Sequence, residues 1–262
     1  MFQRRHKPDQ RRASGAPICA VDQNERLYAV GDVHGRCDLL EALIEKIGRD
    51  AATRSPERRH RIIFLGDYID RGDQSRQVID RLILIKQHLG ARVEFLSGNH
   101  EVALLAFLKD PLKGRSWLDW GGRQTLASYG IAPPSINPDR AGLVSLRDRL
   151  HDAMQEHVAF LQNLPKLALS GDVVFVHAGL DPAYPVDAQP DAALYWGQVE
   201  GGQVSGLPKY RMVHGHYANY DPVSSERRIC VDTGAYFTGR LTAVRLDEEE
   251  AFLHVHVNDL IG

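Results

Sequence analysis

The sequence predicts a fold of the α/β class (α+β mixed), built as a single domain over residues 25–262. Short runs rich in Val, Ile and Phe alternate with helical patterns through the first hundred residues. Each run ends in glycine and polar residues, as strands do in βαβ units. The chain has 262 residues, of which 43% are hydrophobic and 25% charged, so it can bury a substantial core.

The first three expected strands are the short apolar runs 26–30, 61–65 and 92–96, each with a glycine close behind. Residues 37–50 and 75–90 lie between them and carry apolar residues at helical spacing. In the first helix the apolar face consists of Leu39, Leu40, Leu43, Ile44 and Ile47. The order strand, helix, strand, helix, strand predicts two βαβ units.

Capping signals mark the ends of these two helices. Asp38 and Ser75 are expected to cap the N-termini, and Gly90 is expected to end the second helix. Strands joined by such helices run in the same direction, so their C-terminal ends meet along one edge of the sheet. Ligands bind at that edge in open α/β folds.

Residues 109–160 interrupt the alternation. They contain loops marked by proline and most of a helical stretch at residues 143–164. We expect a cap-like insertion beside the ligand-binding edge. After it, the apolar runs 172–176, 210–213 and 228–231 are three further expected strands.

The N-terminal residues 1–24 are expected to form a flexible basic tail, because their first part is basic and polar and lacks an apolar signal-peptide segment. A net charge of −2 argues against nucleic acid as a partner. No apolar run approaches the ~20 residues that a membrane span needs. The cysteines are odd in number and far apart, at Cys19, Cys37 and Cys230, which predicts reduced thiols in a cytoplasmic protein.

Polar side chains of one chemical kind follow the expected strands. Carboxylate, amide and imidazole groups are ligands for Mn, Fe or Zn ions, and thiolates are absent from the set. Because the strand ends meet at one edge, these groups are expected to gather there. The set consists of Asp32, His34, Asp67, Asp70, Arg71, Asn99, His100, His177 and His216.

The set holds more candidate ligands than one tetrahedral ion needs. It suits two ions roughly 3.5–4 Å apart that share one carboxylate. Asp67 follows the middle one of the first three strands, so it is the expected bridge. Arg71 offers a planar fork that fits two phosphate oxygens. The other histidines, His151, His157 and His214, are expected to be structural.

The motifs GDVHG, GDYIDRG, GNHE, VHAG and HGH, together with WLDWGG and VDTGAYFTGRLTAV, resemble the signature of the phosphoprotein phosphatase family of metallophosphoesterases. Within that family the sequence is most similar to bacterial and phage serine/threonine phosphatases of the bacteriophage lambda type. The resemblance covers residues 28 to about 246. It implies a calcineurin-like metallophosphoesterase fold, with a central β-sandwich flanked by helices and a dimetal site at the strand ends.

The resemblance also implies a role for each site residue. His100, paired with Asp70, would be the general acid, and Arg71 would hold the phosphoryl group. The first metal would be bound by Asp32, His34 and Asp67, and the second by Asp67, Asn99, His177 and His216. The cofactors would be two divalent ions, with Mn²⁺ expected and Fe or Zn as alternatives.

One position departs from the family pattern. Such phosphatases usually carry a second phosphate-binding arginine soon after a tryptophan, whereas Gly197 and Gln198 follow Trp196 in this chain. Either this second contact is absent or Arg123 of the insertion replaces it. Trp117 and Trp120 of the insertion either anchor it or serve the site.

The expected function is metal-dependent hydrolysis of phosphate monoesters, with a phosphoprotein or phosphopeptide as substrate. A nucleotide hydrolase of the diadenosine tetraphosphatase kind shares most of these motifs and is the alternative. The triplet Asp70, Arg71 and Gly72 favours the protein phosphatase, because the nucleotide hydrolases usually lack that aspartate. A degenerate binding module that keeps the fold without activity is the third possibility, against which the complete ligand set argues. The oligomeric state is left open.

Overall fold

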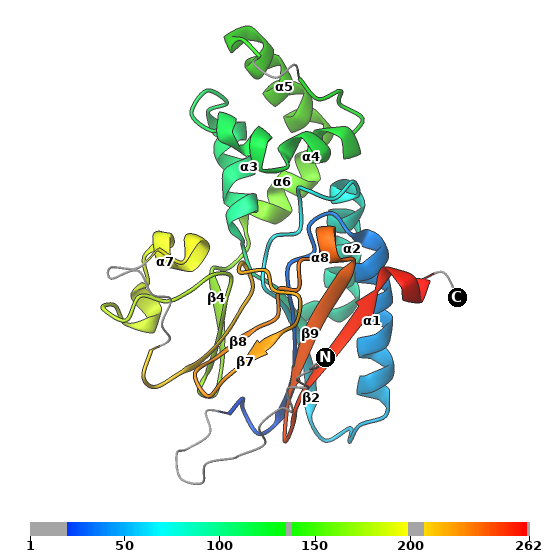
Figure 1. Ribbon diagram of the computed structural model, residues 1–262, viewed down its shortest axis with the longest axis vertical. Helices are drawn as coiled ribbons and strands as arrows, with labels where there is room; N and C mark the ends of the chain where they lie inside the picture. The colour runs from blue at the N-terminus through cyan, green and yellow to red at the C-terminus, as the bar shows by residue number, and fades with distance from the viewer. Residues whose placement is uncertain (1–19, 135–137, 199–206, 261–262) are drawn as a thin grey trace, which may run out of the picture.

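The computed structural model describes residues 20–134, 138–198 and 207–260. Two five-stranded sheets form the centre of the molecule (Figure 1). The first sheet has the order β10-β9-β1-β2-β3 and consists of β1 (Glu25–Val30), β2 (Arg59–Phe64), β3 (Val93–Phe95), β9 (Arg240–Leu246) and β10 (Glu250–His256). The second has the order β4-β5-β6-β8-β7 and consists of β4 (Leu167–Ser170), β5 (Val173–Val176), β6 (Arg211–His214), β7 (Val223–Ser224) and β8 (Arg228–Cys230).

Both sheets contain a run of three parallel strands. In the first sheet β1 pairs with β2 and β2 with β3, all parallel, so β2 lies in the middle as the sequence predicts. In the second sheet β5, β6 and β8 are parallel in the same way. All six strands expected from the sequence are present, and the loops at their C-terminal ends carry the predicted site residues.

Alternate residues of the first strand face different layers. Leu27 and Ala29 pack in one apolar cluster with Phe175 and Val213 of the second sheet, so this face forms the inside of a β-sandwich. Tyr28 and its neighbours on the opposite face pack against helices. The fold is therefore a helix-flanked β-sandwich, as expected.

Helices cover the outer faces of the sandwich and rise above one end of it. Figure 1 shows α1 (Cys37–Ala52) and α2 (Ser75–Leu89) beside the first sheet and α7 (Asp191–Trp196) beside the second. The remaining helices of the first two thirds stand together above the strand ends (Figure 1): α3 (Asn99–Lys109), α4 (Gly122–Ser128), α5 (Arg140–Ala153) and α6 (Gln155–Gln162). The short helix α8 (Ala235–Thr238) precedes β9.

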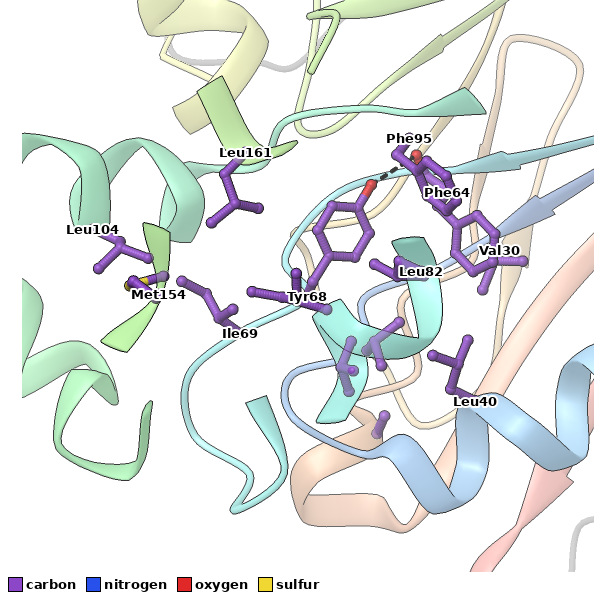
Figure 2. Close-up of a cluster of buried hydrophobic side chains, with 14 of the residues drawn as sticks. Val30, Leu40, Phe64, Tyr68, Ile69, Leu82, Phe95, Leu104, Met154 and Leu161 are labelled. Carbon is purple, nitrogen blue, oxygen red and sulfur yellow. Dashed lines mark hydrogen bonds between the residues drawn. The ribbon is translucent and has the colours of Figure 1, made fainter. Parts of the chain in front are cut away.

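The helices of the 109–160 region share one core with the first sheet. Figure 2 shows Leu104, Met154 and Leu161 of α3 and the α5–α6 region around Ile69 and Tyr68, which follow β2. The same cluster continues to Phe64 and Val30 inside the sheet. The 109–160 region therefore packs directly on the loop that follows β2.

Two predicted helix caps are wrong. α1 begins at Cys37, so Asp38 lies in its first turn and pairs with Arg36 at 2.6 Å. Ser75 is the first residue of α2, and its hydroxyl accepts the backbone N–H of Asp70 instead. The expected helical stretch at 143–164 is also two helices, which are separated by Met154.

Residues 1–19 of the expected tail lie outside the described residues, as does Cys19. The next residues are tied to the second sheet: the carbonyl of Ala20 accepts the N–H of Asp172, and the N–H of Asp22 donates to Ser170 Oγ. Cys37 and Cys230 are both free thiols. Among the described residues, no helix is long and apolar enough to cross a membrane.

A single buried carboxylate, that of Glu101 in the first turn of α3, joins the loops after β2 and β3. Its Oε2 accepts the N–H groups of Asp67 and Gly98, both at 2.9 Å, and its Oε1 accepts that of Tyr68 at 2.8 Å. Burial and the neighbouring Asp67 raise the pKa of Glu101 to about 7, while the N–H donors of Tyr68 and Gly98 oppose that shift. Three backbone groups that would otherwise be buried without an acceptor are thus satisfied by one side chain.

We expect Glu101→Gln to lower the free energy of unfolding by about 1–3 kcal/mol, because the amide cannot accept all three N–H groups and leaves at least one buried donor without a partner. Urea denaturation of the variant and the parent measures the difference. Glu45→Gln on the exposed face of α1 is the matched control, since Glu45 bonds only Arg49 at the surface. Equal stabilities for all three proteins would contradict this role of Glu101.

Candidate metal centre and active site

The nine predicted site residues come from five loops that follow parallel strands. Asp32 and His34 follow β1, three residues follow β2, and two stand at the start of α3 after β3. His177 follows β5 and His216 follows β6, so the second sheet contributes as well. The three residues after β2 are Asp67, Asp70 and Arg71, and those at α3 are Asn99 and His100. All are buried or partly buried except Arg71, which is exposed.

The backbone of this site is held in an uncommon conformation. Among the described residues, positive φ angles outside glycine occur at five positions, all of them in the predicted set. These are His34 (43°), Asp67 (55°), Asp70 (70°), Arg71 (68°) and His216 (65°). Such angles cost free energy and persist only where the surrounding structure enforces them. The uncommon backbone angles therefore set the direction in which these five side chains leave their loops.

Glycines allow the loops to approach one another. Gly72 lies against the loop after β1, where a Cβ atom would clash with the carbonyl oxygen of His34. Gly215 lies against Asp32, where a Cβ atom would overlap the carboxylate. Only glycine permits contacts this close, which accounts for the glycines in the motifs.

Asp67 lies between two groups of histidines. Its Oδ2 is 3.5 Å from His34 Nε2, and its Oδ1 is 3.5 Å from His177 Nε2. Two sets of possible metal-binding atoms, each within 4.8 Å of one another, share this carboxylate: one adds His34 and His100, and the other adds His177 and His216. A carboxylate with one oxygen toward each set has the arrangement of a bridging ligand.

The histidines are oriented by backbone carbonyls. Nδ1 of His34 bonds the carbonyl of Ile69 at 2.8 Å, and Nδ1 of His177 bonds that of Leu65 at 2.9 Å. When Nδ1 carries the proton, Nε2 presents a lone pair, and this pattern is usual for metal-binding histidine. His177 Nε2 then faces another acceptor, Asn99 Oδ1, at 2.8 Å. A cation bound by both atoms would remove the repulsion between their lone pairs.

The buried carboxyl groups of the site favour the binding of cations. Burial, then Asp232 and Asp67, raise the pKa of Asp32 well above its usual value. Burial and Asp67 likewise raise the pKa of Asp232 to about 6. With Glu101 and Asp70, five carboxyl groups of the site are buried, and buried charge is costly unless it is paired or bound to metal.

The imidazoles are in the form that binds metal. Burial lowers the pKa of His34 to about 3 and that of His216 to about 4, and it also lowers the pKa of His177. All three are therefore neutral near pH 7, as metal ligands must be. Neutral imidazoles, an amide oxygen and clustered carboxylates fit two divalent ions of the Mn, Fe or Zn kind.

His100 and Asp70 form a buried pair. His100 Nδ1 is 2.7 Å from Asp70 Oδ2, and the aspartate raises the pKa of the imidazole together with Asp67, against the opposing effect of burial. Asp70 also accepts from Trp117 Nε1 at 2.9 Å and from the Thr125 hydroxyl at 2.5 Å. Trp117 and Thr125 belong to the 109–160 region, so the insertion positions this pair.

Arg71 lies at the open side of the site. One end of its guanidinium donates to the Tyr236 hydroxyl at 2.7 Å, and the other end lies 3.2 Å from His100 Nε2. The ring of Tyr236 in turn packs edge-on against His34, with centroids 5.4 Å apart. Arg71 is thus held between the candidate acid and an aromatic ring while it stays open to solvent.

Arg123 has two partners within the 109–160 region. Its guanidinium donates to the carbonyl of Pro134 at 2.8 Å and lies 3.6 Å from Asp119. Among the other histidines, His157 bonds Tyr129 and Asp80, and His214 bonds the carbonyl of Gly215.

Sequence reasoning missed four residues of the site. Glu101, Thr125 and Asp232 act on neighbouring groups of the site, through hydrogen bonds or charge, and the sequence does not reveal such contacts. The role of Glu101 could have been predicted from the GNHE motif. A glutamate at the third position of a helix commonly accepts the N–H of the capping residue, here Gly98. Tyr236 follows the VDTG motif and is recognisable only once α8 is placed beside Arg71.

Three comparisons bear on the identity of the chain. The model of the calcineurin-like phosphoesterase family matches residues 25–247. The bis(5′-nucleosyl)-tetraphosphatase PrpE (asymmetrical) of Oceanobacillus iheyensis is 27% identical over 86% of this chain and 90% of its own length. The symmetrical bis(5′-nucleosyl)-tetraphosphatase of an Acidovorax strain is 31% identical over 66% of this chain but only 50% of its own length.

Among solved structures, a serine/threonine phosphatase from Saccharomyces cerevisiae has the same fold. Its TM-score is 0.57 at 14% identity, over 92% of this chain and 84% of that chain. The family match spans all five loops of the site and every strand of the two sheets except β10. The chain therefore belongs to the calcineurin-like phosphoesterase family, whose members are metal-dependent hydrolases of phosphate esters with a dinuclear centre.

Proposed function

We propose that this phosphoesterase hydrolyses bis(5′-nucleosyl) tetraphosphates. The observation that supports this most is the similarity to the Oceanobacillus tetraphosphatase, which extends over 86% of this chain and 90% of the relative. The PrpE tetraphosphatase of Bacillus subtilis is similar to the same degree, 27% over 84% of this chain. The proposal adopts the alternative that the sequence left open, and the likeness to lambda-type phosphatases stays a prediction.

In this proposal the site residues form two groups, one that binds the metal ions and one that binds the substrate. In this proposal Asp32, His34 and Asp67 hold one ion, Asp67 is shared, and the second ion is held by Asn99, His177 and His216. When bound, two such ions lower the pKa of water and polarise a phosphoryl group. Mn²⁺ is the ion we propose, since oxygen and imidazole donors suit it.

Arg71 is proposed to bind the phosphoryl group under attack. Its fork can donate two hydrogen bonds to phosphate oxygens, which gain charge in the transition state. His100 is proposed as the general acid: Nδ1 is held by Asp70, and Nε2 lies 3.2 Å from Arg71, so it can deliver a proton to the leaving oxygen of a phosphoryl group bound there.

A second candidate is dephosphorylation of phosphoserine or phosphothreonine in proteins. The buried pair of Asp70 and His100 favours it, because the alkoxide of serine is a poor leaving group and needs a proton donor. A nucleotide that leaves from a phosphoanhydride is a much weaker base and depends less on that proton. Both substrates can use the same ions and the same arginine.

A substrate panel distinguishes the two candidates. With Mn²⁺ added, we expect kcat/KM for diadenosine tetraphosphate to exceed that for a phosphoserine peptide by at least about tenfold, a transition-state preference of roughly 1.4 kcal/mol. para-Nitrophenyl phosphate serves as a substrate without base or peptide. Faster turnover of the peptide would overturn the proposal in favour of the second candidate.

We expect Asp67→Asn to lose at least one metal equivalent and nearly all turnover, because the amide removes the negative charge shared by two cations. Metal analysis after dialysis against Mn²⁺ gives the stoichiometry directly. Asp172→Asn, at an exposed aspartate just before β5, is the matched control. An active Asp67→Asn variant with two metal equivalents would refute the bridging role.

We expect His100→Asn to retain both metals and to lose roughly 10²–10⁴-fold in kcat on a phosphoserine peptide, the range of general acid catalysis. The loss on para-nitrophenyl phosphate should be distinctly smaller, because that leaving group is stable without a proton. Trp117→Phe, which removes one donor to Asp70, should show the same pattern more mildly. His151→Asn on α5 is the control.

Steady-state kinetics on both substrates, with metal content measured in parallel, decide this prediction. Equal losses on the two substrates would show that His100 acts through its charge on the phosphoryl group. Loss of a metal would make it a ligand instead.

A further inference from the structure

An exposed aromatic patch borders the site on the side of Arg71. It consists of Tyr220, Tyr236 and Phe237, whose exposed fractions are 79%, 36% and 51%. The rings contact one another: centroids of Tyr236 and Phe237 are 5.0 Å apart, and those of Tyr220 and Phe237 are 6.3 Å apart. Three large aromatic side chains together at the surface are typical of a binding surface rather than of a monomer's exterior.

The backbone beneath the patch is fixed. Gly234 and Gly239, both with positive φ, bound the short helix α8 that carries Tyr236 and Phe237. Arg36 donates to the carbonyl of Ala235 at 3.0 Å, and the ring of Phe237 lies where a Cβ atom on Gly234 would be. The backbone that carries these two rings is therefore held in place before any ligand arrives, which lowers the entropic cost of binding.

The loop that carries Tyr220 is fixed as well. Arg240 donates to the carbonyl of Tyr220 at 3.0 Å and to Asp221 at 2.6 Å. The N–H of the neighbouring Asn219 donates to the carbonyl of Asp232, which also belongs to the site. A ring that is largely exposed thus stands on backbone connected to the metal-binding loops.

Tyr236 connects this patch to the phosphate-binding residue. Its hydroxyl accepts from Arg71, and the guanidinium carbon lies 4.8 Å from the centre of its ring. The oxygen that accepts this bond keeps its own proton for a further acceptor, such as a phosphate oxygen. A ligand that follows this surface outward from Arg71 therefore begins with phosphate and continues into an aromatic group.

We propose that the aromatic patch binds a nucleobase of a substrate whose phosphates lie at Arg71. The rings of Phe237 and Tyr220 stand at 81° to each other, so the base stacks on the face of one ring and packs against the other edge-on. Tyr236 lies between this surface and Arg71, where the phosphate binds. Stacking on π faces recognises any base and needs no hydrogen-bond pattern. This inference rests on the proposed function, since a nucleoside 5′-phosphate unit is the part of the substrate that it explains.

The test measures the base separately from turnover of the tetraphosphate. Adenosine 5′-monophosphate and ribose 5-phosphate are compared as competitive inhibitors of para-nitrophenyl phosphate hydrolysis by the Mn²⁺-loaded enzyme. We expect the adenine-containing inhibitor to bind roughly tenfold tighter or more in the parent, as stacking predicts. In Phe237→Ala and in Tyr220→Ala the ratio of the two inhibition constants should fall toward one.

Tyr184→Ala is the matched control, because Tyr184 is also a half-exposed tyrosine but lies on the 181–189 loop near α7. It should keep the parent's ratio. Equal inhibition constants in the parent, or a ratio that survives in both patch variants, would overturn the inference. Failure of the parent to cleave diadenosine tetraphosphate would instead overturn the proposed function, and the inhibitor ratio would still decide whether the patch binds a base.

Discussion

The carboxylate of Glu101 is the contact on which the site depends. It binds backbone N–H groups of Asp67, Tyr68 and Gly98 at 2.8–2.9 Å, so one side chain fixes the ends of two neighbouring strands. Asp67 is thereby held between the two histidine groups, and α3 begins where Asn99 faces His177. The cost of burying this carboxylate beside Asp67 is offset by its N–H donors and, in the loaded enzyme, by the cations that the surrounding carboxylates attract.

Side chains of the 109–160 region contact the site directly. Trp117 and Thr125 donate to Asp70, which holds His100, and the apolar residues of α5 and α6 pack on the segment after β2. Arg123 bonds the carbonyl of Pro134 and lies 3.6 Å from Asp119, so whether it replaces the arginine that is missing after Trp196 stays a prediction. Tyr236, whose hydroxyl accepts from Arg71, is a direct neighbour of the proposed phosphate-binding residue.

Much of this could be predicted from the sequence, because each site strand ends in an abrupt change from Val, Ile and Phe to glycine and a metal-binding residue. The C-terminal ends of parallel strands meet at one edge of a sheet. The sequence therefore predicts that Asp32, Asp67 and His177 lie close together. β9 and β10 were not predicted: β9 is buried on both faces and shows no alternation, and β10 mixes histidine and glutamate with apolar residues. Ser75 was misjudged as a cap because a hydroxyl before a helix looks the same whether it binds the helix or Asp70.

The motifs do not identify the substrate. They describe residues for two metal ions and one phosphate group, and phosphate monoesters and nucleoside tetraphosphates both contain such a group. What the motifs do claim is a dinuclear centre bridged by Asp67. Anomalous diffraction from crystals of the Mn²⁺-loaded enzyme tests that claim most directly. We expect two manganese peaks roughly 3.5–4 Å apart, with Asp67 bound to both. A single peak, or two ions with Asp67 bound to only one, would contradict it.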